Sequence, residues 1–96
     1  MPVRGENALV WVAVTRITRD GTMQRRVVDT SWFDDYLQWE RLAASAVESP
    51  PPYRPVPGIP IYHLSVGDQV VLVAEYDLDG PLLDLVTAVM ALGEEA

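Results

Sequence analysis

The stretch IYHLSVGDQVVLVAEY, residues 61–76, predicts a strand, a tight turn and a second strand. Its second arm contains an apolar run without a break, residues 70–74. A half-buried strand alternates apolar and polar side chains, because successive residues face opposite sides of a sheet. The unbroken run therefore predicts a strand buried on both faces, as in the centre of a sheet. Gly67 and Asp68 form the predicted turn, since glycine supplies the positive φ that a two-residue hairpin needs.

A second hairpin is predicted nearer the N-terminus. Residues 8–18 (ALVWVAVTRIT) are rich in β-branched and aromatic side chains, which favour a strand. The first half of this strand is apolar on both faces, so it is a second candidate for a central position. Asp20 and Gly21 predict a turn, and residues 22–29 return as a more polar strand suited to a sheet edge. Loops of two and three residues place opposite faces inward, and both alternatives stay open.

Residues 32–48 are predicted to form an amphipathic helix. Ser31 is the candidate N-cap, with Asp34 three residues later as in a capping box. At about 100° per residue, one broad face of this helix is apolar and lies on the sheet. Glu40 projects close to the middle of this apolar face. The apolar residues are Trp32, Phe33, Tyr36, Leu37, Trp39, Ala43, Ala44 and Val47.

A proline-rich crossover and a second helix complete the pattern. Residues 49–60 hold six of the eight prolines, which predicts a stiff segment largely in polyproline II conformation. Residues 77–80 are expected to cap a second helix, with Pro81 at its first position and Gly93 at its end. The apolar residues of this helix are Leu82, Leu83, Leu85, Val86, Val89, Met90 and Leu92.

The order β-β-α-β-β-α predicts the α+β class, a two-layer sandwich of two helices on a four-stranded, mainly antiparallel sheet. Residues 8–93 form the predicted single domain, between a flexible N-terminal end at residues 1–7 and a frayed tail at residues 94–96. Two strands that are apolar on both faces need more cover than one layer of helices provides. Two helices side by side span about 20 Å, enough for four strands at about 4.8 Å each. We therefore expect both helices on one face and a homodimer through the sheet or through the wide helix faces.

Composition narrows the function classes. The chain has 96 residues, is 49% hydrophobic and carries a net charge of -7. Such a chain can bury a core, and its negative charge argues against nucleic acid or an anionic membrane as partner. It has no cysteine and one histidine, so we expect no disulfide, no metal and no cofactor. No apolar run is long enough to cross a bilayer, and a cytoplasmic protein is expected.

Four of the seven cationic residues lie on the first hairpin: Arg16, Arg19, Arg25 and Arg26. Clustered arginines can clamp phosphate. Alternation divides these residues between the two faces of the hairpin, however. We expect them to be solvated or paired with acidic residues of the same protein.

Glu40 and His63 are the candidate catalytic residues. A carboxylate on an apolar face is costly unless it is paired, so Glu40 either pairs with a hairpin arginine such as Arg16 or Arg25 or acts as an acid or base. With the two-residue turn, His63 shares a mostly apolar face with Ile61, Leu72 and Ala74, which favours a core or interface histidine. If Glu40 and His63 met between the first helix and the sheet, near Tyr36 or Tyr62, they would form an acid–base pocket.

The candidate ligand or partner contacts are aromatic: Trp32, Tyr36, Trp39 and Tyr62. The favoured hypothesis is a small acidic, non-enzymatic binding or accessory module that acts through homo-oligomerisation and a protein partner. The alternative is a small-ligand-binding protein or enzyme that uses the Glu40–His63 pocket.

Overall fold

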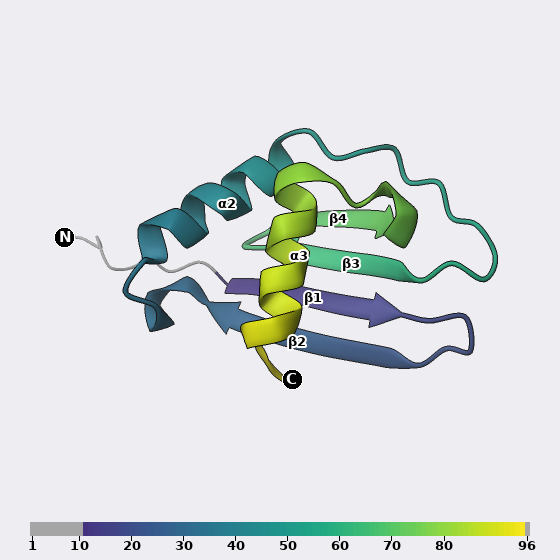
Figure 1. Ribbon diagram of the computed structural model, residues 1–96, viewed down its shortest axis with the longest axis horizontal. Coiled ribbons are helices and arrows are strands. Elements are labelled where there is room, and N and C mark those ends of the chain that lie inside the picture. Colours follow the sequence, from purple (N-terminus) through teal and green to yellow (C-terminus); the bar gives the residue numbers. More distant parts are fainter. Residues whose placement is uncertain (1–10, 96) are drawn as a thin grey trace.

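A computed structural model of the chain describes residues 11–95. The predicted N-terminal end at residues 1–7, and the start of the first predicted strand, lie outside the described residues. The described chain is an α+β fold with two α-helices and one antiparallel sheet, which confirms the predicted class (Figure 1). The elements are β1 (Trp11–Ile17), β2 (Met23–Asp29), α2 (Tyr36–Glu48), β3 (Ile61–Val66), β4 (Gln69–Ala74), α3 (Gly80–Leu92) and β5 (Glu94–Glu95), with 3-10 turns η1 (Thr30–Trp32) and η2 (Glu75–Asp77).

The sheet has five strands in the order β4-β3-β1-β2-β5, so the prediction of four strands is wrong. The additional strand, β5, pairs antiparallel with β2 and falls within the predicted tail. Gly93 ends α3 and brings the chain close against β2, since a Cβ at this position would lie 3.0 Å from the Arg26 Cβ and 3.1 Å from the Val27 backbone nitrogen. A strand of two residues is too short for an alternating pattern, and its sequence therefore does not reveal it.

The predicted central position of residues 70–74 is also wrong. They lie in β4 at the edge of the sheet, whereas β1 lies between β3 and β2 as predicted. Val71 and Val73 are buried, but Val70 and Leu72 are 57% and 39% exposed. An apolar run shows that both sets of side chains favour burial, and it does not specify which strands pair with it.

Both hairpin turns follow local sequence chemistry. Val66 pairs with Gln69 across the predicted two-residue turn, and Gly67 has a φ of 58°. In the first hairpin the Thr18 amide donates to the Thr22 carbonyl at 2.9 Å, which encloses a three-residue loop, residues 19–21. Of the two loop lengths left open by the sequence, the longer one is therefore formed.

The first helix begins later than predicted. It starts at Tyr36 rather than Trp32, and residues 30–32 form the 3-10 turn η1. Asp29 caps this 3-10 turn, because its Oδ1 accepts hydrogen bonds from the backbone amide and the hydroxyl of Ser31, whereas the N-cap of α2 is Asp35, which makes no side-chain capping hydrogen bond. The carboxylate at the end of β2 thus holds Ser31 in the short turn. The second helix has Gly93 at its end as predicted, but it begins at Gly80, so Pro81 occupies its second position rather than its first.

Both helices lie on the same side of the sheet, and α3 crosses the strands in front of β1 (Figure 1). Alternate residues of the strands project toward the helices, and we call this side the closed face. The closed face and the helices together form the buried core. It comprises Val12, Val14, Val28, Tyr62, Leu64, Val71 and Val73 of the sheet, with Trp39, Ala43, Ala46, Leu82, Leu85, Val86 and Val89 of the helices.

Candidate functional site

The other side of the sheet, which we call the open face, has neither α2 nor α3 packed against it. The strand register defines it, since residues directly opposite one another in an antiparallel pair share a face. Its most exposed apolar side chains are Trp11 (55%), Met23 (62%), Val70 (57%) and Leu72 (39%). The complete set is Trp11, Ala13, Thr15, Ile17, Met23, Arg25, Val27, Asp29, Ile61, His63, Ser65, Val70, Leu72 and Ala74.

The open face is ordered in rows that run across the strands from β4 to β2. The first row is wholly apolar, the second contains His63, Thr15 and Arg25, and the third is made of small or β-branched side chains, while Trp11 and Asp29 form a further pair beyond the third row. These rows are Ala74, Ile61, Ile17 and Met23; then Leu72, His63, Thr15 and Arg25; then Val70, Ser65, Ala13 and Val27. Most of this surface is therefore apolar or uncharged, with its charges toward β2.

The charged groups of the open face differ from those of the whole chain. The chain has 14 acidic residues, whereas the sheet register places only Asp29 and, on β5, Glu94 on this side of the described sheet. Arg25 is the one cationic side chain of the described open face, and its guanidinium has no hydrogen bond or ion pair with the described residues. A strongly acidic protein thus has one broad surface that is poor in acidic groups.

The open face continues onto an aromatic edge. The Trp11 ring packs edge-on against Trp32 of η1, with centroids 6.2 Å apart. Trp32 is 47% exposed and Tyr36, at the start of α2, is 37% exposed. Of the predicted partner contacts, these two therefore reach the surface. Trp39 is buried and stacks on Phe33 at 4.7 Å, and Tyr62 is also buried.

Glu40 and His63 are not brought together. His63 projects from the open face beside Leu72 and Thr15, and it shares that face with Ile61 and Ala74 as predicted. Glu40 belongs to α2, which packs on the closed face. The sheet therefore separates the two residues, and the predicted acid–base pocket does not form between the first helix and the sheet.

Glu40 remains a misfit in its surroundings. Its Oε2 atom is buried and has no hydrogen-bond partner among the described residues. The predicted ion pair with Arg16 or Arg25 is wrong, because Arg16 pairs with Glu75 and Arg25 projects from the open face. Within residues 11–95, no group of three or more histidine, cysteine or acidic side chains is placed to hold a metal ion.

A polar cluster that the sequence did not reveal lies at the end of the closed face. Arg16 Nε donates to the Tyr62 hydroxyl at 3.1 Å, and this hydroxyl donates to Glu75 Oε2 at 3.2 Å. The Arg16 guanidinium also lies 3.6 Å from Glu75. Burial raises the pKa of Tyr62 above its usual value, with Glu75 adding to the effect and Arg16 opposing it. The three residues come from β1, β3 and η2, so no sequence spacing indicates their meeting.

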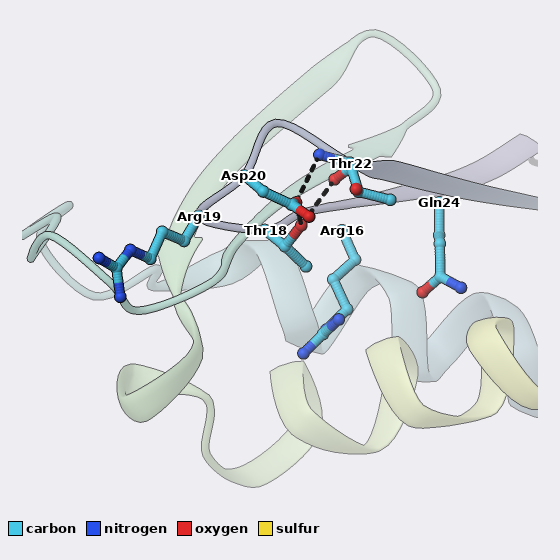
Figure 2. A pocket seen from close by; sticks show the side chains of 6 residues that line it. All are labelled: Arg16, Thr18, Arg19, Asp20, Thr22 and Gln24. Carbon is cyan, nitrogen blue, oxygen red and sulfur yellow. Dashed lines mark hydrogen bonds between the residues drawn. The ribbon is translucent and has the colours of Figure 1, made fainter.

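Two hollows adjoin this cluster. One, of about 490 Å³, lies along α3 and is lined by Tyr62, Glu75, Leu78, Leu83, Val86, Thr87, Met90 and Ala91. The other, of about 610 Å³, lies at the first hairpin and is lined by Arg16, Thr18, Arg19, Asp20, Thr22 and Gln24. Figure 2 shows Arg16 and Arg19 pointing in different directions, so these two arginines do not converge on a single anion.

Asp20 organises the hairpin loop rather than a binding site. Its Oδ1 accepts from the Thr18 hydroxyl at 2.6 Å and from the Thr22 amide at 3.0 Å (Figure 2). These hydrogen bonds, the one from Thr18 first, lower the pKa of Asp20 to about 2. The carboxylate is therefore charged and already engaged with its own loop.

The hairpin arginines that project from the closed face pair with acids of the same protein, as expected. Arg16 lies 3.6 Å from Glu75, and Arg26 lies 3.6 Å from Glu95. Of the helices within residues 11–95, none has the length and apolar character needed to cross a membrane.

Comparisons of the chain with protein-family models, with curated proteins and with solved structures find no match. Function must therefore be inferred from the surfaces of this chain. The open face of the described sheet carries the exposed apolar side chains Trp11, Met23, Val70 and Leu72 and two acidic residues, Asp29 and Glu94.

Proposed function

We propose that this protein is a small, acidic, non-enzymatic binding module that forms a homodimer by burying its open face. One observation carries the proposal: both helices occupy the closed face, while Trp11, Met23, Val70 and Leu72 remain exposed on the other. A contiguous exposed apolar patch on a soluble protein marks an interaction site. Removing such a surface from water contributes about 25 cal/mol per Å² of apolar area.

Charge supports a second copy as the occupant of the open face. With a net charge of -7, two copies of this chain repel one another over most of their surface. The open face of the described sheet carries Arg25 together with Asp29 and Glu94, so this repulsion is weak there. A two-fold dimer buries the same patch on both copies, and this surface meets that requirement.

The aromatic edge extends the open face and is the proposed contact for a protein partner. Trp32 and Tyr36 are exposed beside Trp11, and tryptophan and tyrosine supply a large share of the binding energy at protein interfaces. The placement of Glu40 and His63 on opposite sides of the sheet favours this binding role over the acid–base pocket.

A matched pair of threonine substitutions tests the homodimer. Thr15 lies at the middle of the open face, whereas Thr87 is exposed on α3 on the opposite side of the sheet. Thr15→Glu places a charge in the proposed interface, and Thr87→Glu adds the same charge outside it. We expect sedimentation at micromolar concentration to give a dimer for the wild type and Thr87→Glu, and a monomer for Thr15→Glu.

Circular dichroism of both variants verifies that the fold is kept. A monomeric wild-type protein at micromolar concentration would contradict the proposal. So would a Thr15→Glu variant that is folded and has the same mass as Thr87→Glu.

A further inference from the structure

The positions of charged, large and small side chains in the rows of the open face indicate the orientation of a second copy. We infer that the two copies meet about a two-fold axis that crosses the strands at Ala13 and Val27, so that Arg25 of each copy pairs with the partner's Asp29. This inference rests on the proposed homodimer and adds its symmetry and its polar contact.

The direction of the axis follows from the strand register. Ala13 and Val27 are directly opposite one another in β1 and β2, in the same row. A two-fold axis that runs along this row reverses the strand direction and places every strand over its own copy. On each strand, a residue a given number of positions before the axis row then faces the partner residue that lies the same number of positions after it. Packed sheets of this kind lie about 10 Å apart, with strands within about 30° of parallel or antiparallel.

The charged groups of β2 are symmetric about this axis. Arg25 and Asp29 lie two residues on either side of Val27, on the same face. The axis therefore places Arg25 of one copy opposite the partner's Asp29, and the same contact forms again by symmetry. Asp29 uses Oδ1 for Ser31, and a carboxylate can accept several further hydrogen bonds. Glu94 pairs with Val27 and therefore lies on the axis row at the sheet edge, where the same symmetry places it opposite the partner's Glu94.

The shapes of the side chains on β1 agree with the same axis. Trp11 and Thr15 lie two residues on either side of Ala13. The axis therefore sets the large, exposed Trp11 ring over the partner's smaller Thr15. Ala13 and Ser65 lie on the axis row itself, and their small side chains allow the two sheets to approach.

The other in-plane axis gives a poorer match. An axis parallel to the strands would place β2 over the partner's β4 and keep the rows in register. Arg25 would then face the partner's Leu72, which is apolar. A buried guanidinium without an acceptor is costly, so the charge pattern selects the axis across the strands.

Single cysteines test the axis without disturbing either charge. The chain has no cysteine of its own, so every cross-link reports the introduced residue. Val70 lies on the axis row and is 57% exposed, whereas Met23 is 62% exposed and lies four residues from the axis along β2. With a short bismaleimide, Val70→Cys should cross-link to itself in high yield and Met23→Cys should not. Equal yields, or the reverse preference, would overturn the axis.

Charge exchange tests the polar contact. Arg25→Glu places a second carboxylate against the partner's Asp29, and we expect the dimer dissociation constant to rise at least tenfold. Asp29→Arg should weaken the dimer in the same way. An equimolar mixture of the two variants restores opposite charges at both contacts, and it should form a heterodimer with an affinity close to that of the wild type.

Arg41→Glu is the matched control, because Arg41 is exposed on α2 and the change in charge is the same as in Arg25→Glu. It should leave the dimer intact. If Asp29→Arg does not fold because the capping carboxylate is lost, Arg25→Glu still tests the polar contact and the two cysteine variants still test the axis. A wild-type dimer that Arg25→Glu leaves unchanged would overturn this contact while leaving the homodimer standing; a monomeric wild type would overturn both.

Discussion

Leu64 and Leu72 lie on neighbouring strands, β3 and β4, and have the same side chain in opposite surroundings. Leu64 is 0% exposed on the closed face, and Leu72 is 39% exposed on the open face. The difference arises from the layer that each side chain faces, since α2 and α3 cover one side of the sheet. The exposure of Leu72 thus follows from the missing second layer, while Ala13, Val27 and Ala74 are buried on the same open face.

The largest expected effect is the contrast between these two leucines. Leu64→Ala should lower the free energy of unfolding by about 2–5 kcal/mol, because it leaves a cavity in a packed core. Leu72→Ala should cost less than about 1 kcal/mol at a dilution at which subunits are separate, since its side chain is already partly in water. Urea unfolding of both variants at low concentration measures the contrast. Equal losses would mean that the two faces are equally covered.

Tyr62 gives the stability of the closed face a dependence on pH. Its pKa is raised, so the unfolded chain releases this proton first as the pH increases. The associated stability is present below the usual tyrosine pKa of about 10 and is lost as the pH rises beyond it. No lysine is present and arginine stays charged, so tyrosines are the side chains that titrate in this range.

Tyr62→Phe should cost about 1 kcal/mol at pH 7, because the buried hydroxyl bonds both Arg16 and Glu75. The deficit relative to wild type should shrink as the pH rises above about 10, the usual tyrosine pKa. Tyr53→Phe, at an exposed position, is the control and should follow the wild type. A Tyr62→Phe deficit that is constant with pH would refute the raised pKa.

A substitution of Glu40 tests whether the buried Oε2 atom in the helix layer lacks a partner. Glu40→Gln removes the charge from a carboxylate whose Oε2 is buried without a partner among the described residues, so the free energy of unfolding at pH 7 should rise by about 1 kcal/mol. Glu94→Gln, at an exposed site, should change it by less than about 0.5 kcal/mol in separated subunits. A loss of stability in Glu40→Gln would show that the carboxylate is engaged by a group that favours its charge.

The smallest expected effect concerns the first hairpin, outside both faces. The carboxyl group of Asp20 should titrate in NMR with a midpoint near its lowered pKa of about 2. The hydrogen bonds that favour its charged form are present above the ordinary carboxyl pKa and are lost as the pH falls through about 2. Thr18→Val removes the strongest of them, so the midpoint should move up toward 3.8. An unchanged midpoint would show that the Thr18 contact does not form in solution.

The sequence predicted the features that depend on a few neighbouring residues. Gly67 and Asp68 specify the second turn, this turn sets the register, and the register places His63 on the open face. Gly93 likewise ends α3 where expected. These predictions succeeded because turn and cap chemistry is local.

Features that depend on distant partners were missed. The position of β4 at the edge, the strand β5 and the Arg16–Tyr62–Glu75 cluster all require knowledge of which segments pair. The start of α2 was missed for a related reason: Ser31, the predicted cap, is held in the 3-10 turn η1 by its hydrogen bond to Asp29. The pattern of apolar and polar residues in the sequence indicates which strand faces favour burial. Only the tertiary structure shows which elements cover them.

The most direct test of the open face uses isoleucine methyl groups. The chain has three isoleucines, of which Ile17 and Ile61 lie on the open face and Ile59 lies in the proline-rich crossover. In a sample that mixes methyl-labelled and unlabelled chains, filtered NOE spectra detect only contacts between copies. We predict intermolecular NOEs from the methyl groups of Ile17 or Ile61; Ile59 lines a hollow together with both of them and is therefore not a control. Their absence from both open-face residues at millimolar concentration would contradict the burial of this face by a second copy.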